Sequence, residues 1–235
     1  MTDSFTIDYF PIIYELEQKG LVTRTFRRLD PERQMAVIQA ILDEAGENGP
    51  QDLNIKRVAE RAGVSTGSLY QYFKNRDGLL LFAVELVTRI TVKTFEGYRP
   101  YMAEIPLEQG LSTYLECGDA WTKEQLGFAR FFGSAAYHGD PQLGETVVRP
   151  VAGVMRSMIE ELLRAAVKRG ELRPDLDIEA AGRVLHTLTI AIGDGLLYPA
   201  LNNYYQLLDG EFPPERIYAT FTDMILHGIY KEKKP

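Results

Sequence analysis

The stretch from Asn54 to Phe73 constrains the fold more than any other part of this sequence, because it divides into two short helices with almost nothing between them. Asn54 is a typical N-cap residue, and the helix it opens ends at Gly63, the residue type best suited to the left-handed conformation that closes a helix. Only Val64 separates this glycine from Ser65, a second capping residue. Two short helices joined by so tight a turn predict a helix-turn-helix.

The rest of the chain predicts an all-α protein, because apolar residues recur at helical spacing and no segment alternates with the period of a strand. Asp30 and Pro31 mark the cap and first position of a helix, and the pair Arg99-Pro100 marks a break. Glycine and proline also separate the later segments. We expect helices over about 31–45, 55–62, 65–73, 76–98, 107–119, 122–137, 142–169, 178–198 and 214–230.

The second short helix has one apolar and one polar face. Leu69 and Phe73, four residues apart, would pack on the first helix, whereas Thr66, Tyr70 and Lys74 would share the outward stripe. In a DNA-binding helix-turn-helix the second helix enters the major groove, where small residues at its tip allow close approach, tyrosine and lysine contact phosphates, and glutamine reads base edges. The same pattern also suits a helical hairpin with tyrosines on a solvated face.

Charge supports the DNA-binding alternative weakly. The chain has a net charge of −7, yet residues 24–76 contain more Lys and Arg than Asp and Glu, so the acidic excess lies elsewhere. A basic N-terminal third on an acidic body is typical of a modular binder with one surface for a polyanion.

A resemblance sharpens this interpretation. The run LNIKRVAERAGVSTGSLYQYFKNRDGLLLFAVE, residues 53–85, resembles the DNA-binding domain of TetR-family transcriptional regulators, including the VAERAGVS turn and the LYQYFKNRDGLL junction. Asn54 stands where the family usually has Thr, and both residues can cap a helix. The resemblance, with the pattern above, predicts these DNA-binding residues: Asn54, Ile55, Lys56, Ser65, Thr66, Gly67, Ser68, Tyr70, Gln71, Tyr72 and Lys74.

The resemblance also implies the organisation of the rest of the chain. We expect an N-terminal extension over 1–30, the DNA-binding domain over 31–97, and an effector-binding and dimerisation domain over 98–235, in which the last two long helices pair with those of a second copy. Family members commonly bind a small molecule inside this C-terminal bundle. An aromatic and sulfur-rich set, with two polar anchors, would line a pocket for a largely apolar effector, although each member would equally suit plain core packing: Trp121, Phe128, Phe131, Phe132, Tyr137, Met155, Met158, Leu162, His186 and Asp194.

The N-terminal extension carries its own ambiguity. Residues 5–29 are longer than the usual leader of the family and end in Arg24, Arg27 and Arg28. These arginines would contact phosphates or the minor groove beside the main site; alternatively, an extra amphipathic helix would pack on the protein through Phe10, Ile12, Ile13 and Leu16.

Other functional classes lack support in the sequence. His138, His186 and His227 are far apart and show no metal-binding spacing, and no P-loop, dinucleotide fingerprint or nucleophile elbow is present, so we expect no metal, no cofactor and no enzymatic activity. The single cysteine, the absence of a signal-peptide pattern and the lack of a long apolar run predict a cytoplasmic protein without a membrane partner.

The sequence therefore predicts a homodimeric transcriptional regulator, a repressor that a small molecule releases from a palindromic operator. An activator of the same fold, or a helical interaction protein that binds no DNA, are the alternatives.

Overall fold

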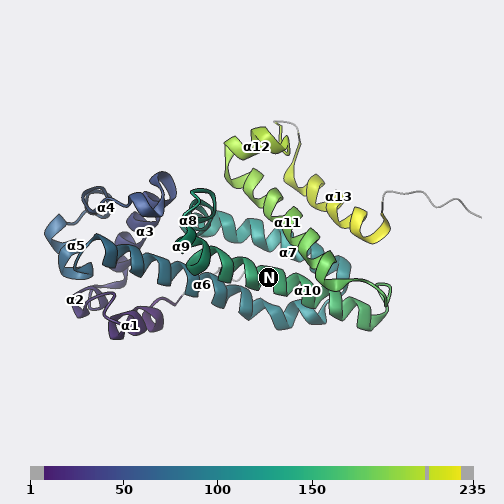
Figure 1. Cartoon of the computed structure of the whole chain (residues 1–235), viewed down its shortest axis with the longest axis horizontal. Coiled ribbons are helices and arrows are strands. Elements are labelled where there is room, and N and C mark those ends of the chain that lie inside the picture. The colour runs from purple at the N-terminus through teal and green to yellow at the C-terminus, as the bar shows by residue number, and fades with distance from the viewer. Residues whose placement is uncertain (1–7, 210–211, 229–235) are drawn as a thin grey trace, which may run out of the picture. The chain divides into compact units, whose positions relative to one another are not determined.

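The computed structural model describes residues 8–209 and 212–228, which form helices and contain no strand (Figure 1). The all-α prediction is confirmed. In chain order the elements are α1 (Phe10–Gln18), α2 (Arg24–Arg27), α3 (Pro31–Asn48), η1 (Pro50–Asp52), α4 (Ile55–Ala62), α5 (Thr66–Phe73), α6 (Arg76–Glu104), α7 (Leu107–Glu124), α8 (Leu126–Tyr137), α9 (Pro141–Leu143), η2 (Gly144–Val148), α10 (Arg149–Arg169), α11 (Ile178–Leu197), α12 (Pro199–Tyr205) and α13 (Pro214–His227).

The chain divides into two compact units. The first contains residues up to Phe95 together with Glu124–Val154, and the second contains Glu96–Lys123 together with the residues from Met155 onward. The long helices α6 and α10 each contribute to both units. The first unit thus includes α8 as well as the helix-turn-helix region, while the predicted limits of the functional domains stay a prediction.

The core of the first unit forms around α3, which packs against α4 and α8. Asp30 caps α3 by accepting a hydrogen bond from the backbone N–H of Arg33, at 3.0 Å, and Pro31 occupies the first helical position, as the sequence predicts. The buried face of α3 includes Val37, Ile41 and Ala45. This face gives the helix-turn-helix a rigid base.

The second unit is stabilised by polar contacts between the end of α6 and the end of α10. Arg99 pairs with Glu161, and Arg169 donates to the carbonyls of Ala103 and Ile105 at 2.9 and 2.8 Å. The backbone N–H of Leu107, at the start of α7, donates to the Glu171 carboxylate at 2.7 Å. These contacts hold the turn between α6 and α7 onto α10.

Several predicted helix limits are wrong. The predicted break at Arg99-Pro100 is absent, because α6 continues through Pro100 to Glu104; the Arg99–Glu161 pair and the burial of Met102 hold the turn that proline would otherwise disrupt. The expected single helix over 142–169 instead begins with α9 and a π-helical turn, η2. There the hydroxyl of Thr88 donates to the carbonyl of Thr146 at 3.2 Å, which supports the local departure from α-helical bonding.

The predictions for the first helix and for the last helices are confirmed only in part. Residues Ile12, Ile13 and Leu16 of α1 are buried, as the packed-helix alternative requires, but Phe10 is 58% exposed and does not join them. The apolar segment from 178 is divided at Tyr198 into α11 and α12. The end predicted near residue 230 for the last helix lies outside the described residues.

Candidate nucleic-acid interface

The first helix of the helix-turn-helix, α4, has a capped and open N-terminus. The Asn54 Oδ1 accepts hydrogen bonds from the N–H groups of Lys56 and Arg57 at 2.9 and 3.3 Å. The two arginines of α4 turn back to α3, where Arg57 and Arg61 lie 2.6 and 3.5 Å from the fully buried Glu44 carboxylate. Lys56 is exposed and makes no ion pair within the described part of the chain. Lys56 is therefore the cation that α4 leaves available.

The turn has the geometry that its sequence predicts. Gly63 adopts φ = +65°, and the N–H of Val64 returns to the carbonyl of Ala59 at 3.0 Å, which closes α4. Ser65 then caps α5 by accepting from the N–H of Ser68 at 3.0 Å. The two caps fix where α4 ends and where α5 begins.

The second helix, α5, buries its apolar side and exposes its tip. Leu69 and Phe73 are each 1% exposed, whereas the ring of Tyr70 is 51% exposed. A Cβ on Gly67 would meet only the Ser65 hydroxyl, at an ordinary 3.7 Å, so the fold does not require glycine there. Because Gly67 has no side chain, the tip of α5 projects little, although the packing of the protein does not require a glycine there.

Tyr72, which the sequence predicts as a DNA-binding residue, lies on the buried side of α5. Its side chain is only 7% exposed, and its ring lies 5.6 Å from that of Phe26 and 6.2 Å from that of Phe73. The sequence of α5 alone does not predict this packing. The apolar partner of Tyr72 is Phe26, which lies far from α5 in the sequence. A phosphate contact by Tyr72 stays a prediction.

Lys74 occupies an unusual backbone conformation at the end of α5. Its φ and ψ are +61° and −54°, and the N–H of Asn75 donates to the carbonyl of Phe73 at 2.6 Å, which together form a γ-turn of the rare positive-φ type. Such strain persists only where surrounding contacts impose it, and it clusters at functional sites. The turn directs the chain into α6 while leaving the Lys74 side chain exposed.

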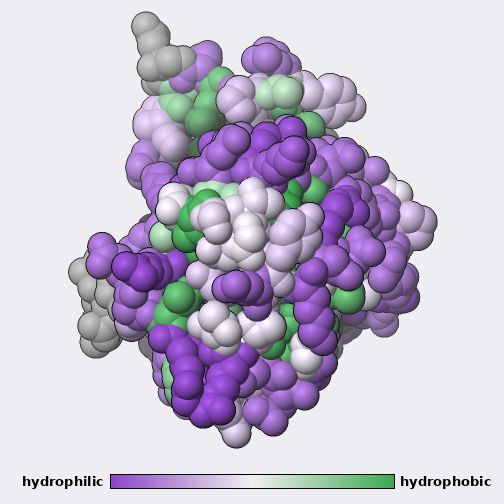
Figure 2. Space-filling view, turned by 90° about the vertical axis from the view of Figure 1, so that its left-hand side faces the viewer, coloured by the Kyte–Doolittle hydropathy of each residue, from purple (hydrophilic) through white to green (hydrophobic). Residues whose placement is uncertain are grey.

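Several of the predicted DNA-binding residues are exposed on α4 and α5 or at their ends, whereas Tyr72 is buried. Figure 2 faces the side on which Figure 1 draws α4 and α5, and shows hydrophilic residues with paler and some hydrophobic ones among them. Two caps, an exposed lysine on each side and an uncluttered helix tip form a surface suited to a phosphate backbone.

A residue outside the predicted set holds the other end of α5. Thr23 donates its backbone N–H to the carbonyl of Tyr72 at 2.9 Å and its hydroxyl to the carbonyl of Gln71 at 2.7 Å. No local pattern identifies this threonine, because its role depends on a contact across some fifty positions of sequence. Of the three predicted basic residues in the extension, Arg27 pairs with Glu17 in α1.

The predicted effector residues lie in both units. Phe128, Phe131, Phe132 and Tyr137 belong to α8 in the first unit, where Phe128 and Phe131 are buried and Tyr137 is exposed. The other six lie in the second unit: Trp121, Met155, Met158, Leu162, His186 and Asp194. Their grouping into one pocket stays a prediction.

Within the second unit, some buried polar atoms have no hydrogen-bond partner. They include the Nδ1 of His186, the hydroxyl of Tyr218 and the hydroxyl of Thr222. Burial, with a smaller effect of Arg156, lowers the pKa of His186, so its imidazole is neutral near pH 7. Buried polar groups are usually hydrogen-bonded, so these atoms mark positions where a polar group of a bound molecule would find a partner.

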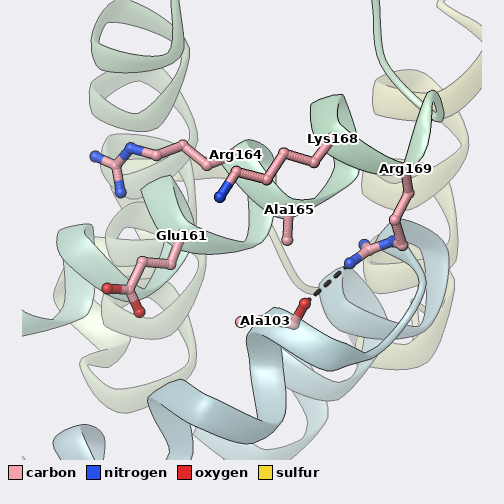
Figure 3. A pocket seen from close by; sticks show the side chains of 6 residues that line it. All are labelled: Ala103, Glu161, Arg164, Ala165, Lys168 and Arg169. Atoms are coloured by element: carbon pink, nitrogen blue, oxygen red, sulfur yellow. Dashed lines mark hydrogen bonds between the residues drawn. The ribbon is translucent and has the colours of Figure 1, made fainter.

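An open groove of about 510 Å³ lies elsewhere in the second unit, between the ends of α6 and α10. It is lined by Ala103, Glu161, Arg164, Ala165, Lys168 and Arg169, and Figure 3 shows Arg169 turned toward the carbonyl of Ala103. None of the predicted effector residues lines this groove, and its cationic lining differs from the apolar pocket expected from the sequence.

The described residues contain no group of His, Cys, Asp and Glu arranged to hold a metal ion. Among the same residues, no helix is long and apolar enough to cross a membrane.

Comparison with known families identifies the helix-turn-helix region. Residues 37–82 match the family described as bacterial regulatory proteins, tetR family. The HTH-type transcriptional regulator BetI of Klebsiella pneumoniae (strain 342) is 46% identical over 52 residues, which cover 22% of this chain and 27% of that protein. The fatty acid metabolism regulator protein of Bacillus subtilis (strain 168) is 36% identical over 47 residues, or 20% and 24% of the two chains. The chain thus spans about a quarter of the length of these relatives.

Solved structures extend the similarity to most of the chain. A TetR family transcriptional regulator from Chloroflexus aurantiacus J-10-FL superposes with a TM-score of 0.64 at 25% identity, covering 88% of this chain and 97% of that one. The regulator FadR from Bacillus subtilis in complex with stearoyl-CoA has a TM-score of 0.61 at 17% identity, covering 83% and 99%. The second likeness concerns the fold alone.

Proposed function

Because this chain belongs to the TetR family of transcriptional regulators and is not an enzyme, we propose that it binds operator DNA as a homodimer and represses transcription until a small effector releases it. The observation that carries the DNA-binding part is the exposed tip of α5. Gly67 and Gln71 are exposed there, and the packing of the protein does not require a glycine at position 67.

The proposed contacts divide by chemistry. Lys56, Tyr70 and Lys74 are exposed and contact phosphates, which fixes the position of α5 but carries no sequence information. Thr66 and Gln71 read base edges, because hydroxyl and amide groups match the donor and acceptor pattern of the major groove. Asn54 and Ser65 cap helices whose free N–H groups face the DNA backbone.

Selection from a pool of random duplexes tests this proposal. The purified protein should enrich a pseudo-palindrome with half-sites about one DNA turn, or 34–36 Å, apart. Tyr70→Ala should weaken binding to the selected and random duplexes alike, whereas Gln71→Ala should reduce their ratio. Tyr101→Ala is the matched control, since Tyr101 is similarly exposed, at 48%, but lies in the part of α6 that belongs to the second unit. Enrichment of no sequence, with no binding to any duplex, favours the alternative of a helical interaction protein.

Dimerisation is proposed from the surface of the last helices. Val184 and Leu188, four residues apart on α11, are 59% and 45% exposed, and Met224 on α13 is 47% exposed. Exposed apolar side chains at helical spacing favour burial against an identical face. A two-fold dimer would supply the two copies of α5 that a palindrome requires.

The effector is proposed to enter the bundle of the second unit and to satisfy buried polar groups there. The unpartnered Nδ1 of His186 supports this location, and the apolar residues predicted for the pocket that lie in the same unit favour an apolar molecule with a polar end: Trp121, Met155, Met158 and Leu162. A solved neighbour of the same fold is a complex with stearoyl-CoA. Long-chain acyl-CoA is therefore the first probe for this protein.

Coupling between effector and DNA is proposed to pass through α6, which starts beside α5 and continues into the second unit. A typical coupling of about 1–3 kcal/mol corresponds to a 5- to 150-fold loss of operator affinity when the effector is bound. Titration of the selected duplex with and without stearoyl-CoA measures it, and free CoA serves as the control. Tighter binding with the acyl-CoA favours the activator alternative, and equal affinity excludes this class of effector.

A further inference from the structure

The N-terminal extension, residues 8–29, is attached directly to the proposed recognition helix. Thr23 occupies the carbonyls of Gln71 and Tyr72 at 2.7 and 2.9 Å, and both belong to the last turn of α5, where carbonyls lack partners within the helix. Phe26 is fully buried, with its ring centroid 5.6 Å from that of Tyr72 and 5.2 Å from that of Phe73. The extension therefore completes the C-terminal end of α5.

The short helix α2 is also held from its other side. The Gln34 amide nitrogen of α3 donates to the carbonyls of Phe26 and Arg27 at 3.1 and 2.8 Å, and Gln34 is itself 9% exposed. Because α2 is bonded to both α3 and α5, its position relative to the recognition helix is defined on two sides. The outward-facing side chains of α2 therefore have a defined position relative to α5.

Most cations near α2 are already engaged. Arg27 pairs with Glu17, Lys19 lies 3.3 Å from Glu85, and Arg89 lies 2.6 Å from Glu15. These pairs attach α1 to α2 and to α6. The positive charges of these three side chains are balanced within the protein, so they are less available to bind a phosphate than unpaired cations are.

Arg24 and Arg28 remain exposed, and neither forms an ion pair with any residue that the structure describes. They lie four positions apart, on the face of α2 opposite the buried Phe26. The ammonium group of Lys74 approaches the same segment, since a Cβ placed on Gly20 would lie 4.0 Å from it. The segment that contacts the C-terminal end of α5 through Thr23 and Phe26 thus carries two exposed arginines, and Lys74 lies at that end of the helix.

We propose that the extension is a second DNA-contacting element, in which Arg24 and Arg28 bind phosphates beside the site read by α5 and Thr23 acts as a positioning residue for that helix. The proposal rests on the proposed function, because it requires α5 to lie on DNA. The guanidinium groups suit phosphate oxygens, and phosphate contacts position a protein without reading sequence.

Salt dependence of DNA binding tests the two arginines. The double variant Arg24→Ala/Arg28→Ala should reduce the slope of log K against log salt by about 1.8, which is about 0.9 for each phosphate lost. Binding to the selected duplex and to random duplex should weaken by the same factor. The control Lys168→Ala/Arg173→Ala removes the same charge from exposed positions of the second unit and should leave the slope unchanged.

Thr23 is tested separately by Thr23→Val, which keeps the shape of the side chain and removes its hydroxyl donor. We expect the salt slope to persist while the ratio of selected to random affinity falls several-fold, and Thr23→Ser, which restores the donor, should recover the ratio. Thermal unfolding of each variant shows whether the fold is intact.

The outcomes separate this inference from the proposed function. If Tyr70→Ala weakens DNA binding but the double arginine variant has the wild-type slope, the arginine contacts are refuted and the regulator remains. A ratio unchanged in a folded Thr23→Val refutes the positioning role. If the wild-type protein binds no duplex at all, the proposed function itself fails.

Discussion

Helices α5 and α11 distribute polar and apolar side chains in opposite ways. On α5 the apolar Leu69 and Phe73 are buried and the polar tip is exposed to water. On α11 the imidazole nitrogen of His186 is buried without a partner, whereas Val184 and Leu188 are exposed.

This difference indicates what each helix lacks. A helix with a satisfied interior and a polar outer face needs no further apolar cover and offers hydrogen bonds to a polar partner. A helix with exposed apolar residues and an unsatisfied buried nitrogen has two unmet requirements, one for apolar cover and one for a hydrogen bond. This difference is why we propose that α5 binds DNA and that the region of α11 binds a second copy and an effector.

Charge introduced on the exposed face of α11 should have the largest effect. Leu188→Glu would place a carboxylate where two copies meet, so the protein should become monomeric. Operator affinity should fall by about 10²–10⁴-fold, because the second half-site would no longer be held at high effective concentration. Light scattering and DNA titration measure the two effects. Leu81→Glu is the matched control: Leu81 is 43% exposed but lies on α6 in the first unit, and its variant should remain dimeric. A dimeric Leu188→Glu would contradict the proposed interface.

A substitution at the tip of α5 should weaken DNA binding but leave the stability of the fold unchanged. Gly67→Ala adds a methyl group that meets nothing closer than the Ser65 hydroxyl, at 3.7 Å, so the melting temperature should stay or rise slightly. DNA affinity should fall about tenfold, or about 1.4 kcal/mol, because the added group separates the helix tip from the groove. Calorimetry and titration of the same sample provide both values. Unchanged affinity would show that the tip does not approach DNA closely.

Replacing Lys74 by glycine should raise the stability of the protein and weaken its binding to DNA. Glycine tolerates the positive φ of this position, so Lys74→Gly should relieve backbone strain and stabilise the protein by about 1 kcal/mol. It should also lose one phosphate contact and reduce the salt slope by about 0.9. Lys74→Ala separates these effects, since it removes the charge and keeps the strain. If both variants have the same stability, surrounding contacts rather than φ determine the energy of the turn.

The sequence was most informative where function depends on local chemistry. The caps Asn54 and Ser65, the left-handed Gly63 and the anchors Leu69 and Phe73 follow from patterns of a few residues, and the structure confirms them. Local patterns failed where distant residues decide. Tyr72 is buried because Phe26 packs on it, and Pro100 lies inside a helix because burial and an ion pair outweigh its local preference.

The candidate sites differ for the same reason. The residues proposed to contact DNA belong to two adjacent helices, so their grouping could be predicted from spacing. The effector residues are spread from position 121 to 194, and no spacing rule tells a pocket lining from ordinary core. The unsatisfied nitrogen of His186 is a property of the fold alone, and it supplies the information that composition lacked.

The smallest expected effect concerns this histidine. Burial lowers its pKa from the ordinary 6.5, so at mildly acidic pH the unfolded chain binds a proton that the folded protein does not. Stability should therefore fall as the pH decreases below about 6.5, and His186→Gln, which keeps a polar side chain but does not titrate, should reduce that dependence. Melting temperatures of both proteins between about pH 7.5 and 5.5 measure the difference, with His227→Gln, a variant of an exposed histidine, as the control.

A bound effector that accepts or donates at the Nδ1 of His186 should raise the melting temperature of the wild type more than that of His186→Phe, because only the wild type has a buried polar group left to satisfy.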